Sequence, residues 1–457
     1  MFYKRDPIIA QASATGKAGV GVIRVSGEHL RPLIDRLCTK QPIPRYATLL
    51  HIKDESDQSI DQGLLTYFPA PHSFTGEDVI EFHGHGGPIV LSLVIQRLLD
   101  LGQDIALRIA MPGEFSERAF LNNKIDLAQA EAIADLIDAT TVAAVKSANR
   151  SLSGVFSEKI NHLIEKLTHL RILVEATLDF PEEEIEFLEN ANAKEQWANI
   201  LSGLLETLHT SEQGALLREG ALVVLAGPPN VGKSSLLNQL AQQDIAIVTP
   251  IAGTTRDRIR EQIQIDGVPI SIVDTAGLRE SQDEVEKIGI ERSWAAIGDA
   301  DIILFMRDAT QSNQGESEEL LHKISEELIK KQNLKAKVLE VWNKQDQAPL
   351  QPREEALLIS AKSGYGVELL KHQILQTLGW ESHTENTILA RGRHIEALKK
   401  ALKHLQSSQV YLSQGNASLE LFAEELRLTQ DALGEITGKL LPDDLLGKIF
   451  SSFCIGK

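Results

Sequence analysis

Cysteine is scarce in this sequence of 457 residues and occurs only at Cys38 and Cys454. Two cysteines near opposite ends exclude a disulfide-stapled secreted domain and favour a reducing compartment. The sequence also lacks any run of about 18 apolar residues, so no membrane-spanning helix is expected. No apolar stretch follows the basic residues at the start, and Asp6 argues against a transit peptide. These absences predict a soluble, cytoplasmic protein without a membrane partner.

An excess of positive charge is missing as well. Lys and Arg number 46 against 64 Asp and Glu, which gives a formal net charge of −18. Such a surface as a whole repels polyanions, so contact with nucleic acid requires a local basic patch or a partner. The 42% hydrophobic and 24% charged residues are typical of a globular protein. The length allows two to four domains.

Residues 1–122 mix short β-rich runs with Gly and Pro punctuation, which predicts an α/β domain. Strands are expected around Gly21–Val25 and Asp78–Phe82, and apolar spacing predicts a helix over Pro88–Leu101. We interpret residues 83–87, His-Gly-His-Gly-Gly, as a glycine-rich turn after a strand. A metal site there is the weaker alternative, because no third ligand lies nearby.

Helical patterns fill residues 123–219 and resume over 381–457. Each half has apolar faces that need cover, so we expect one helical bundle interrupted by another domain; two separate bundles are the alternative. A basic helix face near the start of the second half could meet tRNA phosphates or be merely solvated. It comprises Arg391, Arg393, His394, Lys399, Lys400 and Lys403.

The interrupting segment, residues 220–380, alternates four buried-strand runs with helical stretches, which predicts a parallel sheet covered on both faces. The runs are Ala221–Ala226, Ile270–Val273, Asp301–Phe305 and Val338–Trp342. The predicted fold class is therefore multidomain: an N-terminal α/β domain and a helical bundle interrupted by a Ras-like P-loop domain.

A phosphate-binding loop follows the first of these strands. Gly-Pro-Pro-Asn-Val-Gly-Lys-Ser over Gly227–Ser234 matches the P-loop pattern between a strand and a helix. Its glycines let backbone N–H groups face phosphate oxygens at a helix N-terminus. We expect Lys233 to reach the β- and γ-phosphates and Ser234 to bind Mg²⁺.

Three further motifs follow in the order found in GTPases. Asp274-Thr275-Ala276-Gly277 follows the second strand, Asn343-Lys344-Gln345-Asp346 follows the fourth, and Ser360-Ala361-Lys362 completes the expected base pocket. The Asp346 carboxylate can accept two hydrogen bonds from guanine, whereas adenine would leave it partly unpaired. The predicted GTP-binding residues are Asn230, Val231, Gly232, Lys233, Ser234, Ser235, Thr249, Pro250, Ile251, Ala252, Gly253, Thr254, Thr255, Asp274, Thr275, Ala276, Gly277, Asn343, Lys344, Asp346, Ser360, Ala361 and Lys362.

Residues 249–257 lie where switch I is expected, with Thr255 as a second Mg²⁺ ligand. Leu278 stands where Ras-type enzymes place the glutamine that orients the attacking water. A hydrocarbon cannot orient water, so another polar group is needed. The carboxylates close by are Glu280, Asp283, Glu284 and Glu286, and position alone does not choose among them.

The P-loop, the GTTRD and DTAGLRE stretches and the terminal Phe-Cys-Ile-Gly-Lys together resemble the MnmE (TrmE) family of tRNA modification GTPases over the whole chain. The resemblance implies that K⁺ is held by Asn230 with oxygens of Thr249, Ile251 and Thr254, supplying the charge of an arginine finger. It also implies that Glu286 orients the water and that G domains pair in a homodimer. Lys233 and Glu286 are then catalytic.

The resemblance further implies that the N-terminal domain binds a reduced folate, 5-formyl- or 5,10-methylene-tetrahydrofolate, at the dimer interface. The implied pocket residues are Arg24, Glu81, Lys124 and Lys457. Cys454 is implicated in the modification reaction, either as a nucleophile on the one-carbon fragment or by positioning and packing.

The expected function is that of a K⁺-dependent GTPase working with the flavoprotein MnmG, which carries the FAD, in a heterotetramer. The pair would install a carboxymethylaminomethyl or aminomethyl group at C5 of U34 in certain tRNAs. Two alternatives stay open: an Era-like RNA-binding switch of ribosome assembly, and a folate enzyme merely fused to a regulatory GTPase.

Overall fold

The computed structural model describes residues 6–179, 192–243, 260–275, 284–311, 315–333, 335–347, 357–381, 387–413, 418–439 and 443–456. The chain forms two compact units. The first contains residues 1–134, 157–179 and 413–457, and the second contains residues 135–156 and 180–412. Among the described helices, none is both long and apolar enough to cross a membrane.

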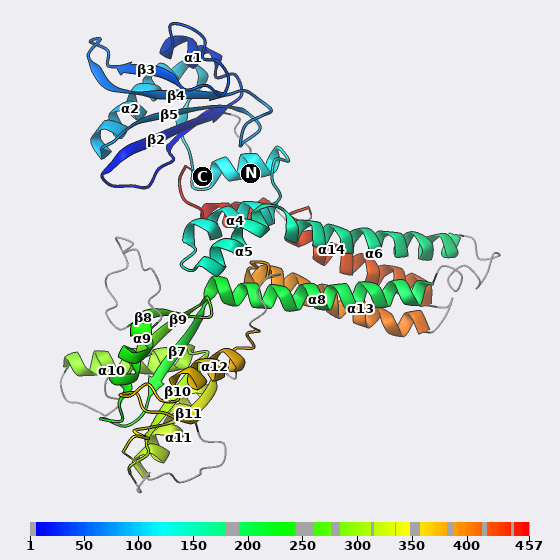
Figure 1. Ribbon diagram of the computed structural model, residues 1–457. Coiled ribbons are helices and arrows are strands. Elements are labelled where there is room, and N and C mark those ends of the chain that lie inside the picture. Colours follow the sequence, from blue (N-terminus) through cyan, green and yellow to red (C-terminus); the bar gives the residue numbers. More distant parts are fainter. Residues whose placement is uncertain are drawn as a thin grey trace. The chain divides into compact units, whose positions relative to one another are not determined.

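The first unit contains a six-stranded sheet in the order β3-β4-β5-β2-β1-β6 (Figure 1). All neighbours are antiparallel except β1 and β6, which are parallel. The strands are β1 (Ile8–Gln11), β2 (Ala18–Gly27), β3 (Thr48–Lys53), β4 (Ser59–Phe68), β5 (Asp78–Gly86) and β6 (Arg108–Ile109). The helical elements among them are α1 (Arg31–Leu37), α2 (Pro88–Leu101) and η1 (Gln103–Ile105).

The predicted elements of this domain are confirmed, and α2 has the predicted bounds. Its apolar stripe, which includes Leu91 and Val94, packs against alternate residues of the sheet such as Ile23 and Phe82. The alternation of β2 and β5 therefore buries one sheet face under a helix.

The predicted turn at residues 83–87 is wrong, because β5 continues to Gly86. Gly84 lies so close to Asp61 that a Cβ atom would stand 2.3 Å from its carboxylate. That carboxylate bonds the ring of His85 at 2.6 Å. The glycine thus makes room for a cross-strand contact. The described residues contain no group of three or more His, Cys, Asp or Glu side chains that could hold a metal ion.

The remaining helices of the first unit come from both ends of the chain: α3 (Glu114–Leu121), most of α4 (Leu127–Asp138) and α6 (Val155–Asp179), α14 (Leu419–Thr437) and α15 (Asp443–Ser451). Arg171 on α6 donates to Gln430 on α14 at 2.8 Å. The rings of Phe120 on α3 and Phe450 on α15 lie 6.0 Å apart.

The second unit shows the same pairing of early and late helices, here α5 (Val142–Leu152), α8 (Ala193–Glu219) and α13 (Gly392–Ser413). Trp197 on α8 donates to the hydroxyl of Ser408 on α13 at 2.9 Å. Ser147 and Ser151 of α5 donate to the carbonyls of Thr387 and Leu389, which precede α13. The two helical stretches of the sequence therefore contact each other, as one interrupted helical region requires.

The sheet of the second unit has the order β12-β11-β10-β7-β9-β8. Its strands are β7 (Ala221–Ala226), β8 (Arg260–Ile265), β9 (Val268–Asp274), β10 (Ile302–Asp308), β11 (Lys337–Asn343) and β12 (Leu357–Leu358). The four predicted strands are confirmed and parallel, whereas the additional strand β8 is antiparallel to β9. The alternating polar and apolar residues of β8 suit an edge position.

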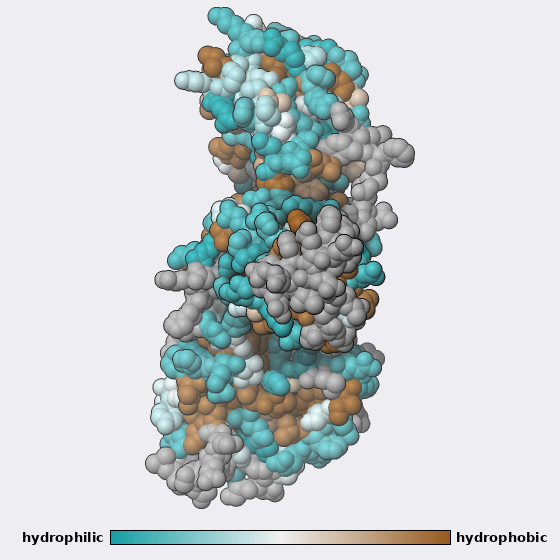
Figure 2. Space-filling model, turned by 90° about the vertical axis from the view of Figure 1, so that its right-hand side faces the viewer, coloured by the Kyte–Doolittle hydropathy of each residue, from teal (hydrophilic) through white to brown (hydrophobic). Residues whose placement is uncertain are grey.

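Helices cover both faces of this sheet, as predicted. Leu236 of α9 (Lys233–Gln243) and Leu370 of α12 (Val367–Thr377) belong to the core on one face. Ile297 of α10 (Glu284–Asp299) and Ile324 of α11 (Gly315–Lys330) belong to the core on the other. On the side of the molecule that Figure 2 shows, hydrophilic residues predominate and apolar residues are interspersed among them.

Candidate nucleotide and ligand sites

The P-loop joins the end of β7 to the start of α9. Gly227, Asn230 and Gly232 have φ values of +144°, +60° and +98°, and α9 begins at Lys233. These left-handed conformations turn the loop tightly, and glycine adopts them without steric cost. The Lys233 ammonium donates to the carbonyls of Gly227 at 2.9 Å and Pro228 at 3.1 Å. The predicted phosphate-binding residues thus surround a helix N-terminus, where anions are favoured.

Ser234 and Asp274, which come from different motifs, meet beside this loop. The Ser234 hydroxyl donates to Oδ2 of Asp274 at 2.9 Å. The other carboxylate oxygen, Oδ1, is buried and has no hydrogen-bond partner among the described residues. An oxygen pair with spare acceptor capacity is the donor set that Mg²⁺ prefers, so these residues fit the ion. Burial lowers the pKa of Lys233, against the opposing effect of Asp274.

The base-recognition motifs form one hydrogen-bonded unit. Asn343 donates to the carbonyl of Val231 at 2.8 Å and accepts from the N–H of Ala361 at 2.9 Å. The Ser360 hydroxyl donates to Asp346 at 2.7 Å, and this bond lowers the pKa of Asp346. Asn343 therefore ties the P-loop to the motif that is predicted to bind the base.

Asp308, at the end of β10, contacts the predicted base motif and was not among the residues predicted from the sequence. Its carboxylate accepts from Lys344 at 2.6 Å and from the hydroxyl of Thr310 at 2.6 Å. Burial alone would raise the pKa of Asp308, but these bonds lower it on balance. Lys344 has a φ of +68°, so the ion pair holds a strained residue of the base motif. The available signal was a carboxylate at the carboxyl end of a buried parallel strand.

Other predicted residues are placed apart from these contacts or lie outside the described part. Thr275 is buried and its hydroxyl donates to Leu225, whereas Ser235 is exposed in the first turn of α9 and Lys362 follows the base motif. Glu286 lies in α10, but its side chain is outside the described atoms. The predicted residues outside the description are Thr249, Pro250, Ile251, Ala252, Gly253, Thr254, Thr255, Ala276, Gly277 and Lys457.

A second candidate site lies on the N-terminal sheet. Arg24 and Glu81 are direct cross-strand partners on β2 and β5, and their side chains are joined at 2.7 Å. Arg24 also donates to the carbonyl of Gly456 in the C-terminal tail at 3.3 Å. Its guanidinium lies 5.7 Å from the ring centre of Phe74. Lys124 donates to Pro71 at 3.0 Å, at the start of the loop that carries Phe74.

The two cysteines differ in their surroundings. Cys454 is exposed, and its carbonyl accepts from the N–H of Gly113 at 3.3 Å. Cys38 is half-buried, and burial raises the pKa of its thiol. The exposed thiol is therefore on the same tail that Arg24 contacts.

The predicted basic helix face is partly wrong. His394 is 2% exposed and packs against Phe156, with tilted rings whose centres lie 5.2 Å apart. Arg391 is half-buried and donates to Asp135 at 2.8 Å, and Lys399 forms an ion pair with Glu212 at 2.8 Å. These contacts neutralise or bury half of the set.

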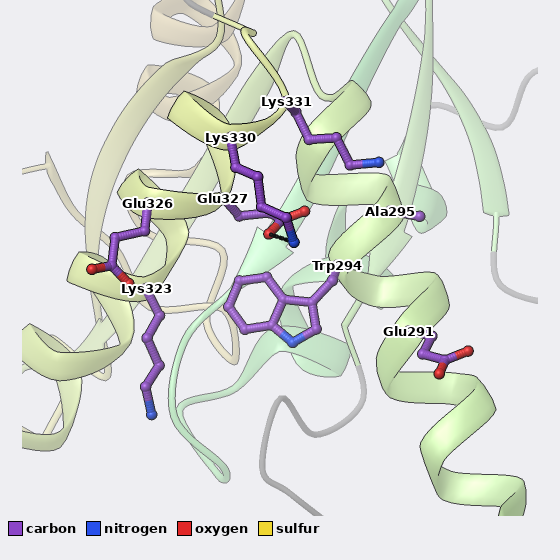
Figure 3. A pocket seen from close by; sticks show the side chains of 8 residues that line it. All are labelled: Glu291, Trp294, Ala295, Lys323, Glu326, Glu327, Lys330 and Lys331. Atoms are coloured by element: carbon purple, nitrogen blue, oxygen red, sulfur yellow. Dashed lines mark hydrogen bonds and ion pairs between the residues drawn. The ribbon is translucent and has the colours of Figure 1, made fainter.

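A groove of about 620 Å³ between α10 and α11 contains none of the predicted site residues (Figure 3). Trp294 of α10 extends toward α11, and the ion pair of Glu327 with Lys330 spans 3.4 Å beside it. The side chains that line the groove include three lysines and three glutamates, so the groove carries charges of both signs.

Comparisons with known proteins cover the whole chain. Residues 7–124 match the family described as GTP-binding protein TrmE N-terminus, and residues 127–454 match the MnmE helical domain. The chain is 55% identical to the tRNA modification GTPase MnmE of Polynucleobacter asymbioticus over 100% of both chains. It is 53% identical to that of Acidovorax sp. over 99% of both. A crystal structure of Era from Aquifex aeolicus matches 40% of this chain and 66% of its own, with 28% identity and a TM-score of 0.28.

Proposed function

The chain belongs to the MnmE family, and we propose that it hydrolyses GTP to install a carboxymethylaminomethyl or aminomethyl group at C5 of tRNA U34 together with the flavoprotein MnmG. Hydrolysis of GTP in tRNA modification is the activity of the family. The nucleotide site is supported by two hydrogen bonds of Asn343, to Val231 and to Ala361, which join the predicted phosphate and base motifs. Ribosome-assembly activity alone would give no account of the N-terminal domain.

In the proposed mechanism, Lys233 and the N-terminus of α9 neutralise the β- and γ-phosphates. Asp346 and Ser360 select guanine, while Asp308 holds Lys344 beside them. Ser234 and Asp274, with Thr255, would hold Mg²⁺, which supplies charge stabilisation when bound. Glu286 orients the attacking water, because Leu278 occupies the position of the glutamine that does so in Ras-type enzymes.

Asn230, with Thr249, Ile251 and Thr254, would hold K⁺. Amide and carbonyl oxygens are hard donors that suit such a cation. The observation in support is that Asn230 is exposed at the loop tip with a φ of +60°, so its amide is available to a ligand. When bound, the cation supplies positive charge to the phosphates.

For the N-terminal domain, taken as residues 1–122, we propose reduced-folate binding at Arg24, Glu81, Lys124 and Lys457. Supporting this, the Arg24–Glu81 pair offers a cation for a glutamate tail and a carboxylate for a pterin edge. Cys454 lies on the tail that Arg24 contacts. We assign residues 123–219 and 381–457 to the helical domain, 220–380 to the G domain, and a homodimer to the whole.

The cation assignment is tested by GTP turnover in K⁺ and in Na⁺. Wild-type turnover should fall sharply in Na⁺, and Asn230→Ala should remove most of that difference. Asn238→Ala, an exposed asparagine on α9, is the control and should keep it. Turnover that is equal in both salts would refute the cation assignment.

The folate assignment is tested by calorimetry with 5-formyltetrahydrofolate. The full chain should bind it, and Glu81→Gln should weaken binding by about tenfold. An absence of binding would instead favour a switch GTPase without one-carbon chemistry. Assaying uridine modification with and without MnmG separates the joint activity from that of the chain alone.

A further inference from the structure

The carboxylate that is proposed to meet the pterin edge has a second basic neighbour, which the proposed function does not use. Oε2 of Glu81 lies 3.4 Å from Nε2 of His83, while Oε1 accepts from Nε of Arg24 at 2.7 Å. Glu81 and His83 are two residues apart on β5, so their side chains leave the same face of the sheet. Each oxygen of the carboxylate therefore faces a different basic group.

The other groups around His83 come from its own strand and from the two neighbouring strands. Its cross-strand partners are Val22 on β2 and Leu64 on β4, and both are uncharged. His85, two residues further along β5, is bonded to Asp61 of β4 at 2.6 Å. The described part of the sheet therefore pairs His83 with no carboxylate other than the one two residues before it.

This pair is partly shielded from solvent. The side chain of the histidine is 38% exposed and that of the glutamate is 17% exposed. The ring centres of Phe74 and Phe115 each lie 5.7 Å from the guanidinium of Arg24, which also donates to the carbonyl of Gly456. Partly buried charges are screened less by salt than exposed charges, so a proton gained by the imidazole acts on the carboxylate.

The charge of the imidazole decides what the carboxylate can offer to a ligand. Histidine is the side chain that ordinarily gains or loses a proton between pH 5 and 8. While His83 is neutral, Oε2 of Glu81 keeps its full negative charge for the N–H donors of a pterin edge. Once His83 is protonated, it forms an ion pair with the same oxygen, and the ligand must compete with the imidazolium for it.

We propose that His83 is a positioning residue that controls the access of a reduced folate to Glu81. The site binds folate well when His83 is neutral, and it loses affinity when His83 takes a proton from solvent. This inference rests on the proposed folate function, to which it adds a residue and a dependence on pH.

The test is calorimetry of the full chain with 5-formyltetrahydrofolate at pH 7.5 and at pH 5.5, which bracket the range of an ordinary histidine. Wild-type affinity should fall by about fivefold at the lower pH, the upper range for a partly exposed ion pair. His83→Gln keeps a polar side chain without the change of charge. It should bind within about twofold of the wild type at pH 7.5 and lose most of the decrease.

His51→Gln is the matched control, because His51 is exposed on β3, two strands away from β5, and it should keep the full decrease. Glu81→Gln should bind more weakly and show little further decrease, since the ion pair is gone. A full decrease in either His83→Gln or Glu81→Gln would overturn this inference alone.

Failure of the wild type to bind at pH 7.5 would instead remove the proposed folate function, and this inference with it. A His83→Gln variant that unfolds thermally like the wild type but binds poorly at both pH values would make His83 a direct folate ligand. That result would also overturn control by its proton.

Discussion

Asp308 is a single carboxylate that links the base motif to the end of β10 through Lys344. Because its folded pKa is lowered, its stabilising effect is present above the unfolded value of about 3.9 and is lost as pH falls through the folded value. Asp308→Asn should lower stability by about 1–2 kcal/mol at pH 7 and by much less near pH 3.

Thermal unfolding followed by tryptophan fluorescence measures this effect, since Trp197, Trp294, Trp342 and Trp380 all belong to the second unit. Asp299→Asn, an exposed carboxylate at the end of α10, is the matched control. If the loss of stability in Asp308→Asn were as large near pH 3 as at pH 7, the ion pair would not be its cause.

Glu286 is the other residue-scale prediction. Glu286→Ala should lower GTP turnover by about 100-fold, because the attacking water loses its orienting group, with little change in nucleotide affinity. Single-turnover hydrolysis and nucleotide titration separate the two quantities. Glu291→Ala, an exposed position further along α10, should leave both unchanged. A large loss of affinity would reassign Glu286 to binding.

At the scale of elements, the junction of the P-loop and α9 depends on Gly232. A Cβ atom there would lie 2.2 Å from the amide nitrogen of Asn343, and φ is +98°. Gly232→Ala should therefore displace Asn343 from Val231 and weaken GTP and GDP binding alike, by at least about tenfold.

The matched substitution is Gly289→Ala in α10, where nothing lies within 4 Å of the added atom. It should leave nucleotide affinity unchanged and raise stability slightly, because alanine loses less backbone entropy on folding. Equilibrium nucleotide titration compares the two variants. Equal affinities would contradict the coupling of P-loop and base pocket.

At the scale of the whole molecule, the C-terminal tail contacts the N-terminal domain across more than 300 residues of sequence. A Cβ atom at Gly113 would lie 2.3 Å from the carbonyl of Phe450, and the Gly113 N–H donates to Cys454. Gly113→Ala should release the tail, speed hydrogen exchange over residues 450–456 and weaken folate binding, while GTP turnover stays unchanged.

Gly19→Ala is the control in the same unit, because a Cβ atom at Gly19 would have no other atom within 4 Å. An unaltered exchange rate of the tail in Gly113→Ala would show that this contact does not hold it. Loss of folate binding without release of the tail would place the effect at the sheet instead.

Local sequence determined the class of each segment and most of the nucleotide motifs, because strand alternation, helical spacing and the P-loop depend on residues close together in the chain. α2 and β7 have the predicted bounds for this reason. The family resemblance likewise depended on short motifs, and it predicted that Arg24 and Glu81 belong to a folate pocket.

Tertiary structure decided what depends on residues far apart in sequence. β8 is an antiparallel edge because β9 pairs with it, His394 is buried because Phe156 covers it, and Asp308 is ion-paired because Lys344 reaches it. The tail contact with Arg24 belongs to the same class. A residue's type and its local period specify which face it prefers, but burial and charge pairing are set by neighbours that only folding brings within contact distance.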